Sequence, residues 1–180
     1  MDAQIFSATI KESDAVAAVI CAAFRQFAEK YPEQTRTSRV YPLLPSSEWV
    51  RKTMNHGAEY FLLRQEERPV GCAALIKINA EILFMDRLSV LPEFRREGFG
   101  RYLVRHCLET AQKRGAKRVE TGVPADLTEL VEWYRSLGFR FKQLARFNEL
   151  PFTVAFLYFN LKELEAFFAE EENRPAAGYE

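Results

Sequence analysis

A strand that passes directly into a helix is the feature of this sequence that most restricts its fold. Residues 82–90, ILFMDRLSV, are mostly apolar, and Pro92 ends this strand because proline has no N–H group to donate within a sheet. From Gly98 onward, apolar side chains recur at the spacing of one helical face until Gly115, which has the position of a C-terminal stop. The sequence therefore predicts a buried strand, a glycine turn and an amphipathic helix over residues 82–115.

The rest of the chain alternates between the same two periodicities. Strands are predicted at residues 4–10, 59–64, 70–78, 117–123, 139–147 and 152–160, and helices at residues 13–27, 47–55, 126–138 and 161–169. Asp126 and Glu129 have the spacing of a capping box at the start of one of these helices. The order of elements predicts one α/β domain around a mixed sheet over residues 1–169, followed by a flexible tail over residues 170–180.

Charge and hydropathy argue against two classes of partner. The chain has 25 basic and 25 acidic side chains, so no overall field draws it to nucleic acid or to an anionic membrane. The basic run KRGAKR, residues 113–118, lies at a predicted helix end, where positive charge favours the helix dipole and needs no ligand. No segment approaches the ~20 apolar residues of a membrane span, and the N-terminus does not resemble a signal peptide. A cytoplasmic location is expected.

The three cysteines, Cys21, Cys72 and Cys107, lie far apart in apolar segments. No pair of them has the spacing of a metal site or of a redox motif, so no metal is predicted. Free cysteine is usually buried, and these residues are expected to be reduced parts of the core.

The glycine turn has the character of an anion-binding site. A helix N-terminus carries N–H groups without intrahelical partners and about half a positive charge, and glycine lets an anion approach the backbone. Gly98 and Gly100 lie at this end, with Arg95, Arg96 and Arg101 around them. A plain turn with solvated arginines would have the same letters. The Walker and dinucleotide-binding patterns do not fit, because the first needs G-K-[ST] and the second needs a third glycine where this chain has leucine.

Two motifs in order resemble those of the GNAT acyltransferase superfamily. LSVLPEFRREGFGRYLV, residues 88–104, is similar to the family's acetyl-CoA-binding motif, a strand followed by [QR]-x-x-G-x-[GA] and a helix. EWYRSLGF, residues 132–139, looks like the family's Y-x-x-x-G-F ending. The resemblance covers most of the chain. It implies a single domain with a mostly antiparallel mixed sheet flanked by helices, central parallel strands that splay apart, and a C-terminal β-hairpin.

The resemblance also implies where acetyl-CoA binds as co-substrate. The strand edge at Leu88, Ser89 and Val90 would bind its pantetheine arm through backbone groups, as a peptide adds to a sheet edge. The turn would wrap the pyrophosphate, chiefly with amide N–H groups, over Arg95, Arg96, Glu97, Gly98, Phe99, Gly100 and Arg101. Tyr134 would lie beside the sulfur. An asparagine is common seven residues before this tyrosine in the family, and this chain has Leu127 there, which makes activity less secure than cofactor binding.

Tyr134 and Asp86 are the candidate catalytic residues. By resemblance Tyr134 is a general acid, but proton transfer from a phenol to a thiolate is uphill by about 2 kcal/mol in water, so hydrogen-bond donation is expected. A core role for Tyr134 is the alternative. Asp86 is a carboxylate within an apolar strand, which is costly unless it is paired or functional. An ion pair with Arg87 is its alternative. Further options for the base are Glu81, His56 and a water relay.

The leading hypothesis is an N-acetyltransferase that moves the acetyl group of acetyl-CoA directly to a primary amine in a ternary complex. The acceptor is a small molecule, an amino acid or a protein amine. By resemblance its site lies between residues 25–56 and 145–156. The alternative is a non-catalytic acyl-CoA-binding sensor or interaction domain. No nucleic-acid or membrane partner is expected, and the sequence does not determine whether the chain forms a homodimer, as many GNAT proteins do.

Overall fold

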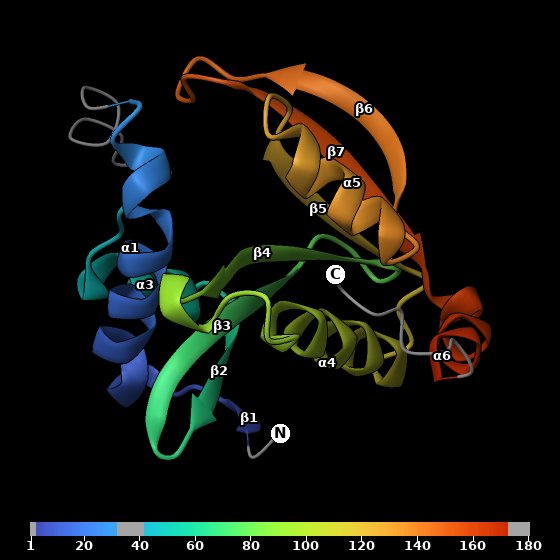
Figure 1. The fold of residues 1–180 in the computed structure, drawn as a ribbon, viewed down its shortest axis with the longest axis horizontal. Helices are drawn as coiled ribbons and strands as arrows, with labels where there is room; N and C mark the ends of the chain where they lie inside the picture. The colour runs from blue at the N-terminus through green and yellow to red at the C-terminus, as the bar shows by residue number, and fades with distance from the viewer. Residues whose placement is uncertain (1–2, 32–41, 173–180) are drawn as a thin grey trace.

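The computed structural model describes residues 3–31 and 42–172, and these form an α/β domain around a seven-stranded sheet (Figure 1). The strands are β1 (Ala3–Ser7), β2 (Glu59–Gln65), β3 (Arg68–Lys77), β4 (Ile82–Val90), β5 (Arg118–Pro124), β6 (Arg140–Arg146) and β7 (Thr153–Asn160). The helices are α1 (Ser13–Ala28), α3 (Ser47–Asn55), α4 (Phe99–Lys113), α5 (Thr128–Ser136) and α6 (Leu164–Glu172). Short 3-10 turns occur at Ile10–Glu12, Pro92–Phe94 and Leu161–Glu163.

The sheet has the order β1-β2-β3-β4-β5-β7-β6, and its pairs are antiparallel except for β4 with β5. This confirms the predicted α/β class, the mostly antiparallel mixed sheet and the C-terminal hairpin, which is β6 with β7. Because β4 and β5 are parallel, α4 has to carry the chain from the end of one strand back to the start of the other. The parallel pair lies in the middle of the sheet.

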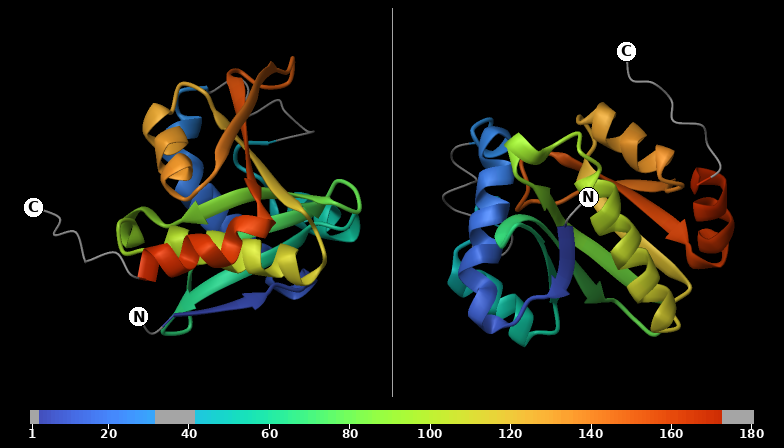
Figure 2. Two further views of the ribbon diagram at one scale, coloured as in Figure 1. Left: turned by 90° about the vertical axis from the view of Figure 1, so that its right-hand side faces the viewer. Right: turned by 60° about the horizontal axis from the view of Figure 1, so that its bottom comes forward.

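Helices cover both faces of the sheet, as the turned views in Figure 2 show. Successive side chains of a strand point to opposite faces, so β2 and β3 contribute to two cores. Phe61 and Leu75 belong to the core under α4, α5 and α6. Tyr60 and Ala74, each one residue before these, belong to the core under α1 and α3. Cys72 and Cys107 are free and buried as predicted, and Cys21, also free, is half-buried.

Three predicted boundaries were wrong for local reasons. The strand predicted over residues 4–10 ends at Ser7, because Thr9 and Glu12 form a capping box that opens a 3-10 turn. The capping box predicted at Asp126 does not form, since α5 begins at Thr128 and its N-cap residue makes no side-chain cap. Residues 170–172 of the predicted tail belong to α6. Residues 173–180 lie outside the described part of the chain.

The central strands separate at the position that matters for function. β4 and β5 pair only over residues 82–85 and 118–121, and no pairing joins them beyond Met85 and Thr121. On its other side β4 loses register with β3, where Cys72 and Ala74 face Ser89 and Asp86, so β4 has one extra residue. Such a bulge bends the strand that carries it. The predicted splay of the parallel strands is confirmed.

Candidate active site

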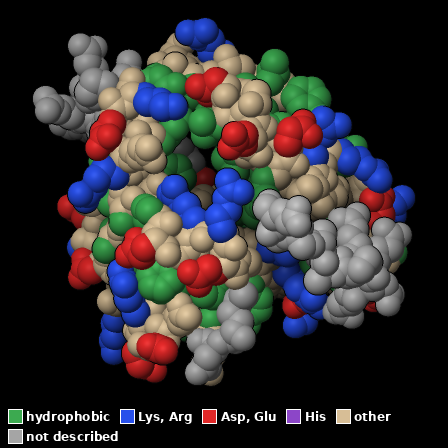
Figure 3. Space-filling view, viewed as in Figure 1, with side chains coloured by type: hydrophobic (Ala, Val, Ile, Leu, Met, Phe, Trp, Pro, Cys, Tyr) green, Lys and Arg blue, Asp and Glu red, His purple; other side chains and the backbone are tan. Residues whose placement is uncertain are grey.

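A cavity of about 810 Å³ lies where the two central strands diverge. Its walls come from β4, β5, α1, α5 and the β6–β7 hairpin. The space-filling view shows a hollow near the middle of the molecule, with Lys and Arg side chains gathered along one rim (Figure 3). The sequence predicted residues from β4 and α5 at this site, and the structure brings Asp86, Leu88, Val90 and Tyr134 to the same cavity.

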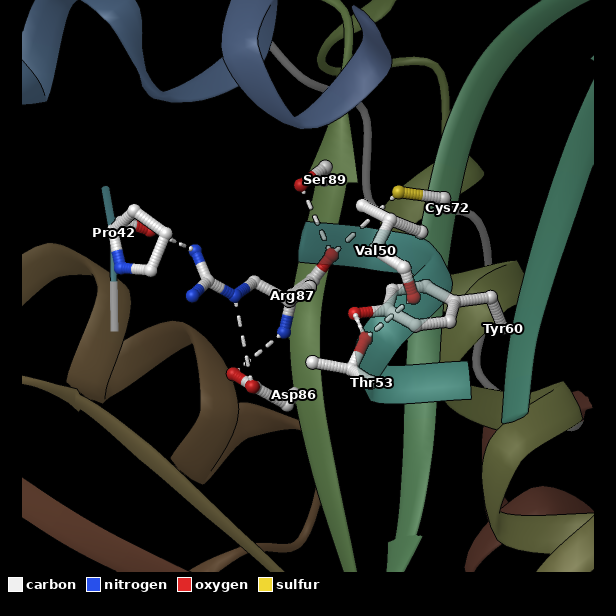
Figure 4. Close-up of polar contacts among 8 residues, drawn as sticks. All are labelled: Pro42, Val50, Thr53, Tyr60, Cys72, Asp86, Arg87 and Ser89. Atoms are coloured by element: carbon white, nitrogen blue, oxygen red, sulfur yellow. Dashed lines mark hydrogen bonds and ion pairs between the residues drawn. The ribbon is translucent and has the colours of Figure 1, made fainter. Parts of the chain in front are cut away.

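Asp86 and Arg87 form a buried ion pair at the bulge of β4 (Figure 4). Arg87 Nε lies 3.6 Å from Asp86 Oδ2, and the two side chains are 0% and 11% exposed. The guanidinium also donates through Nη1 to the Pro42 carbonyl at 2.8 Å and lies 4.7 Å from the centre of the Trp49 ring. The ion pair expected as one alternative for Asp86 is therefore confirmed. Asp86 also lines the cavity, so its catalytic role stays a prediction.

The backbone at Arg87 is strained. Its φ is +53°, a left-handed conformation that costs a residue with a Cβ atom about 1–2 kcal/mol. Three hydrogen bonds hold the bulge in shape. The Arg87 amide donates to Asp86 Oδ1 at 2.8 Å, while its carbonyl accepts from Ser89 Oγ at 3.0 Å and from Cys72 Sγ at 3.8 Å. The Ser89 side chain thus serves the strand itself, and only its backbone is left for the predicted role in cofactor binding.

Tyr134 lies on the α5 side of the cavity and is 3% exposed. Its ring packs edge-on against Trp133 and Phe139, with centroids 4.9 and 5.2 Å away. Burial raises the pKa of Tyr134 well above its usual value, a hydrogen bond with Thr121 opposes the rise, and Cys107 and Asp86 add to it. The phenol therefore keeps its proton at neutral pH and can donate a hydrogen bond. Tyr134 is a core residue and a cavity residue at once.

The turn before α4 has the geometry of an anion-binding nest. Arg96 and Gly98, on either side of Glu97, have φ values of +67° and +85°, and a turn in which left-handed residues alternate with others can direct neighbouring N–H groups to one side. The amide of Tyr102 makes the first bond of the helix, to the Gly98 carbonyl at 3.0 Å, and no acidic residue lies in the first turn. Arg96 and Arg101 are exposed beside it. The turn could hold a phosphate group, as its sequence predicts.

Other residues of the turn have structural roles for their side chains. Arg95 donates to the carbonyls of Ala23 at 2.8 Å and Val90 at 3.4 Å, which ties α1 to the end of β4. Phe99 is buried in the core, so only its backbone faces the turn. A Cβ atom at Gly100 would lie 3.4 Å from the Trp133 ring, which is an ordinary van der Waals contact, so packing against α5 does not require glycine at this position. Glu97 is exposed.

Some predicted candidates lie elsewhere. Glu81 is exposed and forms an ion pair with Lys117. His56 is an exposed residue at the end of α3. Neither residue lines the cavity. Both ranges expected around the acceptor contribute to the cavity, for example at Phe27, Phe147 and Glu149, while residues 32–41 lie outside the described residues. Leu127 lines it too and offers no side-chain hydrogen bond.

Sequence reasoning placed residues 25–56 and 145–156 around the acceptor but did not foresee how many aromatic side chains would line the cavity. Phenylalanine side chains line it from α1, β4, β7 and the hairpin loop, at Phe24, Phe27, Phe84, Phe147, Phe152 and Phe156. Each looks like a core residue in its own segment, and no local pattern joins segments so far apart in the chain. Thr121, the hydrogen-bond partner of Tyr134, was missed for the same reason.

The described residues contain neither a membrane-spanning helix nor a metal-binding cluster. No helix in that part of the chain is long and apolar enough to span a bilayer. No group of three or more His, Cys, Asp or Glu side chains there is arranged to hold a metal ion.

The site combines three features: the splayed strands β4 and β5, the glycine turn before α4, and the buried Tyr134 across the gap. Together they define an acyltransferase-like α/β domain of the class that the sequence resembles. The family model described as Acetyltransferase (GNAT) family matches residues 9–139. The chain belongs to this family.

Individual relatives agree with the family match. An uncharacterized N-acetyltransferase of Methanocaldococcus jannaschii is 28% identical over 130 residues, which are 69% of this chain and 54% of that protein, so the match spans about half of that relative. The [ribosomal protein bS18]-alanine N-acetyltransferase of Escherichia coli K12 is 29% identical over 109 residues, 58% of this chain and 72% of the relative.

Solved structures agree on the fold. The crystal structure of the ribosomal-protein-S18-alanine N-acetyltransferase from Escherichia coli superposes with a TM-score of 0.69 at 18% identity, covering 88% of this chain and 94% of that one. A GNAT family acetyltransferase from Elizabethkingia anophelis, crystallised with acetyl-CoA bound, gives a TM-score of 0.62 at 14% identity, covering 88% and 98%.

Proposed function

We propose that the protein is an N-acetyltransferase that transfers the acetyl group of acetyl-CoA directly to a primary amine while both substrates are bound. The single observation that carries the proposal is the cavity between the splayed strands, where Asp86 of β4 and Tyr134 of α5 line one space. A direct transfer needs a donor and an acceptor side by side, and the open strand edges and the wider cavity offer the two sites.

Acetyl-CoA binds along β4 and the turn before α4. The edges of β4 after Met85 and of β5 after Thr121 are unpaired with each other, so an extended arm fits between them as an added strand. The left-handed backbone at Arg96 and Gly98 directs amides at the pyrophosphate. The Elizabethkingia relative crystallised with acetyl-CoA supports this choice of donor.

Asp86 acts on the amine. A free amine of pKa ~10 is almost wholly protonated at pH 7 and has to lose a proton before its nitrogen attacks. The nitrogen bonds to the thioester carbon, the carbon–sulfur bond breaks, and the electron pair leaves on sulfur. The Asp86 carboxylate, held by Arg87, accepts the amine proton directly or through water.

Tyr134 acts on the leaving group. Transfer of its proton to a thiolate of pKa ~8.5 is uphill even for a phenol of ordinary pKa, and burial raises the pKa of Tyr134 further. The phenol therefore donates a hydrogen bond to the developing thiolate and keeps its proton. A donor already fixed in a buried site stabilises developing charge without reorganisation at the moment of reaction.

The second candidate is an acyl-CoA-binding domain without turnover. Leu127 is the observation that favours it, because this apolar side chain lines the cavity at the position where the family resemblance implies an asparagine. The two candidates share the donor site and differ in the chemistry at Tyr134 and Asp86.

Release of free CoA thiol separates the two candidates. The purified protein is given acetyl-CoA with a panel of monoamines, polyamines, amino acids and peptides that carry a free N-terminus or lysine. Release that depends on one acceptor class, and falls about a hundredfold in Tyr134→Phe at unchanged acetyl-CoA affinity, supports the transferase. Bound acetyl-CoA without release for any acceptor would favour the binding domain instead. A cytoplasmic location and a homodimer stay predictions.

A further inference from the structure

Six phenylalanine rings in the described part of the chain line the cavity. We name Phe24, Phe27, Phe84, Phe147, Phe152 and Phe156 the aromatic wall. The ring of Phe156 has its centroid 6.2 Å from that of Phe84 and 6.1 Å from that of Phe147, and Phe27 and Phe152 form a second group with centroids 5.3 Å apart. Both groups present apolar ring surface to whatever enters the cavity. A ligand there gains free energy by burying apolar area, and a charged or hydroxylated body would lose its hydration without compensation.

Charge on the cavity lining sets a second limit. Its acidic members are Asp86 and Glu149, and its basic members are Lys30, Arg87 and Arg95. Asp86 is already paired with Arg87. Among the described residues of the lining, basic side chains thus outnumber acidic ones, and a polyamine with several ammonium groups would lie among more positive than negative charges. One ammonium group can be accommodated at Asp86, where it has to lose its proton.

The α1 end of the aromatic wall meets the hairpin and limits the length of the ligand. Phe27 and Phe152 have ring centroids 5.3 Å apart, and Tyr31 lies 5.7 Å from Phe152. Tyr31 also donates a hydrogen bond to Asp126 Oδ2 at 3.4 Å. These contacts join α1 to the hairpin and to the segment before α5, so a compact molecule fits the space better than an extended peptide.

We infer that the acceptor is a small monoamine whose single primary amino group is carried by an aromatic or comparably apolar body, with that body on the aromatic wall and its nitrogen at Asp86. This inference rests on the proposed function for the reaction. The expected binding of this amine does not depend on the proposed function, because the aromatic wall would bind the same molecule without acetyl transfer.

The test uses 2-phenylethylamine as the probe in two separate measurements. Titration calorimetry of the amine into the protein saturated with CoA measures binding alone. Thiol release with acetyl-CoA measures transfer, and spermidine, glycine and an alanyl tetrapeptide serve as competing acceptors. We expect kcat/KM for 2-phenylethylamine to exceed that for each of the other three by about tenfold or more, since burying one aromatic ring is worth this much.

Two phenylalanine variants on one hairpin provide a matched pair. Phe147→Ala removes a ring from the aromatic wall, and Phe141→Ala removes an exposed ring from β6 that does not line the cavity. Both residues are more than two-fifths exposed, at 41% and 53%, so neither change empties the core. Phe147→Ala should raise the KM for 2-phenylethylamine about tenfold and leave the KM for acetyl-CoA within about twofold. Phe141→Ala should change neither.

The outcomes separate this inference from the proposed function. Binding of 2-phenylethylamine without thiol release for any amine would overturn the proposed function and keep the ligand class. Release with spermidine or the tetrapeptide in preference to 2-phenylethylamine would overturn the ligand class and keep the transferase. Equal effects of Phe147→Ala and Phe141→Ala would show that the aromatic wall does not bind the amine.

Discussion

Asp86 and Arg87 place two charges in a strand that is otherwise apolar, and each depends on the other. Taking one partner away from a buried pair typically costs about 3–5 kcal/mol, because the remaining charge has lost its compensation. Asp86 also accepts the Arg87 amide, which holds the left-handed backbone of the bulge. A substitution at this position therefore affects stability as well as chemistry, and a useful variant has to keep the oxygen that the amide needs.

Asp86→Asn meets this requirement. It keeps an oxygen for the Arg87 amide and removes the base, so we expect thiol release to fall by about a hundredfold or more. The control is Glu81→Gln, which removes an exposed carboxylate just before the same strand and outside the cavity. The melting temperature of each variant is measured beside its rate. If Asp86→Asn stays folded and turns over within about threefold of the unchanged protein, the proton goes to solvent through a water relay and Asp86 is not the base.

At the level of elements, the two ends of α4 allow a comparison between two roles of glycine. One role is to adopt a left-handed backbone conformation, and the other is to leave room for a ligand. Gly98 and Gly115 flank the same helix and both have positive φ, +85° and +75°. Gly98 precedes the helix at the anion-binding nest, and Gly115 follows it in open space. The two positions share a conformational constraint and differ in their surroundings, so they form a matched pair.

Gly98→Glu should abolish acetyl-CoA binding, since a side chain and a negative charge would occupy the phosphate position. Gly115→Glu should lose a similar amount of stability, about 1 kcal/mol or somewhat more, with acetyl-CoA affinity within about twofold of the unchanged protein. Calorimetric titration of acetyl-CoA measures the affinities and thermal unfolding measures the stabilities. Normal binding by Gly98→Glu would mean that the pyrophosphate lies elsewhere.

The elements differ in how far their sequences determine them. The bounds of β4 were predicted correctly, because an apolar run and Pro92 are local signals. The glycine turn and Asp86 stood out by local signals as well, whereas Tyr134 was singled out by the resemblance to the family's Y-x-x-x-G-F ending, and the functional roles of all three stay predictions. The bulge at Arg87 was not, since it depends on how β3 and β4 align, although two adjacent charges in a buried strand were a hint. The aromatic wall could not be predicted either, because its rings meet only when α1 and the hairpin fold over β4.

At the scale of the whole molecule, two parts of the sheet meet along one short seam. β4 and β5 are joined over residues 82–85 and 118–121, and beyond this seam the cavity separates them. Contacts of α1 with the hairpin, at Phe27 and Phe152, bridge the gap at its outer end. A ligand inserted between the strands would join the two parts of the sheet where the free protein has no pairing. Its binding should therefore slow the local opening of both parts.

Hydrogen exchange tests this expectation. With acetyl-CoA at about a hundred times its dissociation constant, amides of residues 88–90, 96–101 and 122–123 should exchange about tenfold more slowly or better. The exchange rates of amides in β1, at the far edge of the sheet, should be unchanged wherever these amides exchange by local opening. Mass spectrometry of peptic fragments measures both. Protection confined to residues 96–101 would mean that the donor binds at the turn without entering between the strands.

The cavity has one wall made of main chain and another made of side chains, and this difference bears on how such a protein can diverge. Substitution changes a side chain and leaves the peptide amide in position, so outside the bulge at Asp86 and Arg87 the strand edge of β4 can keep its main-chain groups while its sequence changes. A ring such as Phe147, on a hairpin at the surface, can be exchanged one residue at a time without disturbing the sheet. Descendants of this chain could therefore acquire new acceptors by single mutations while keeping the same acetyl donor.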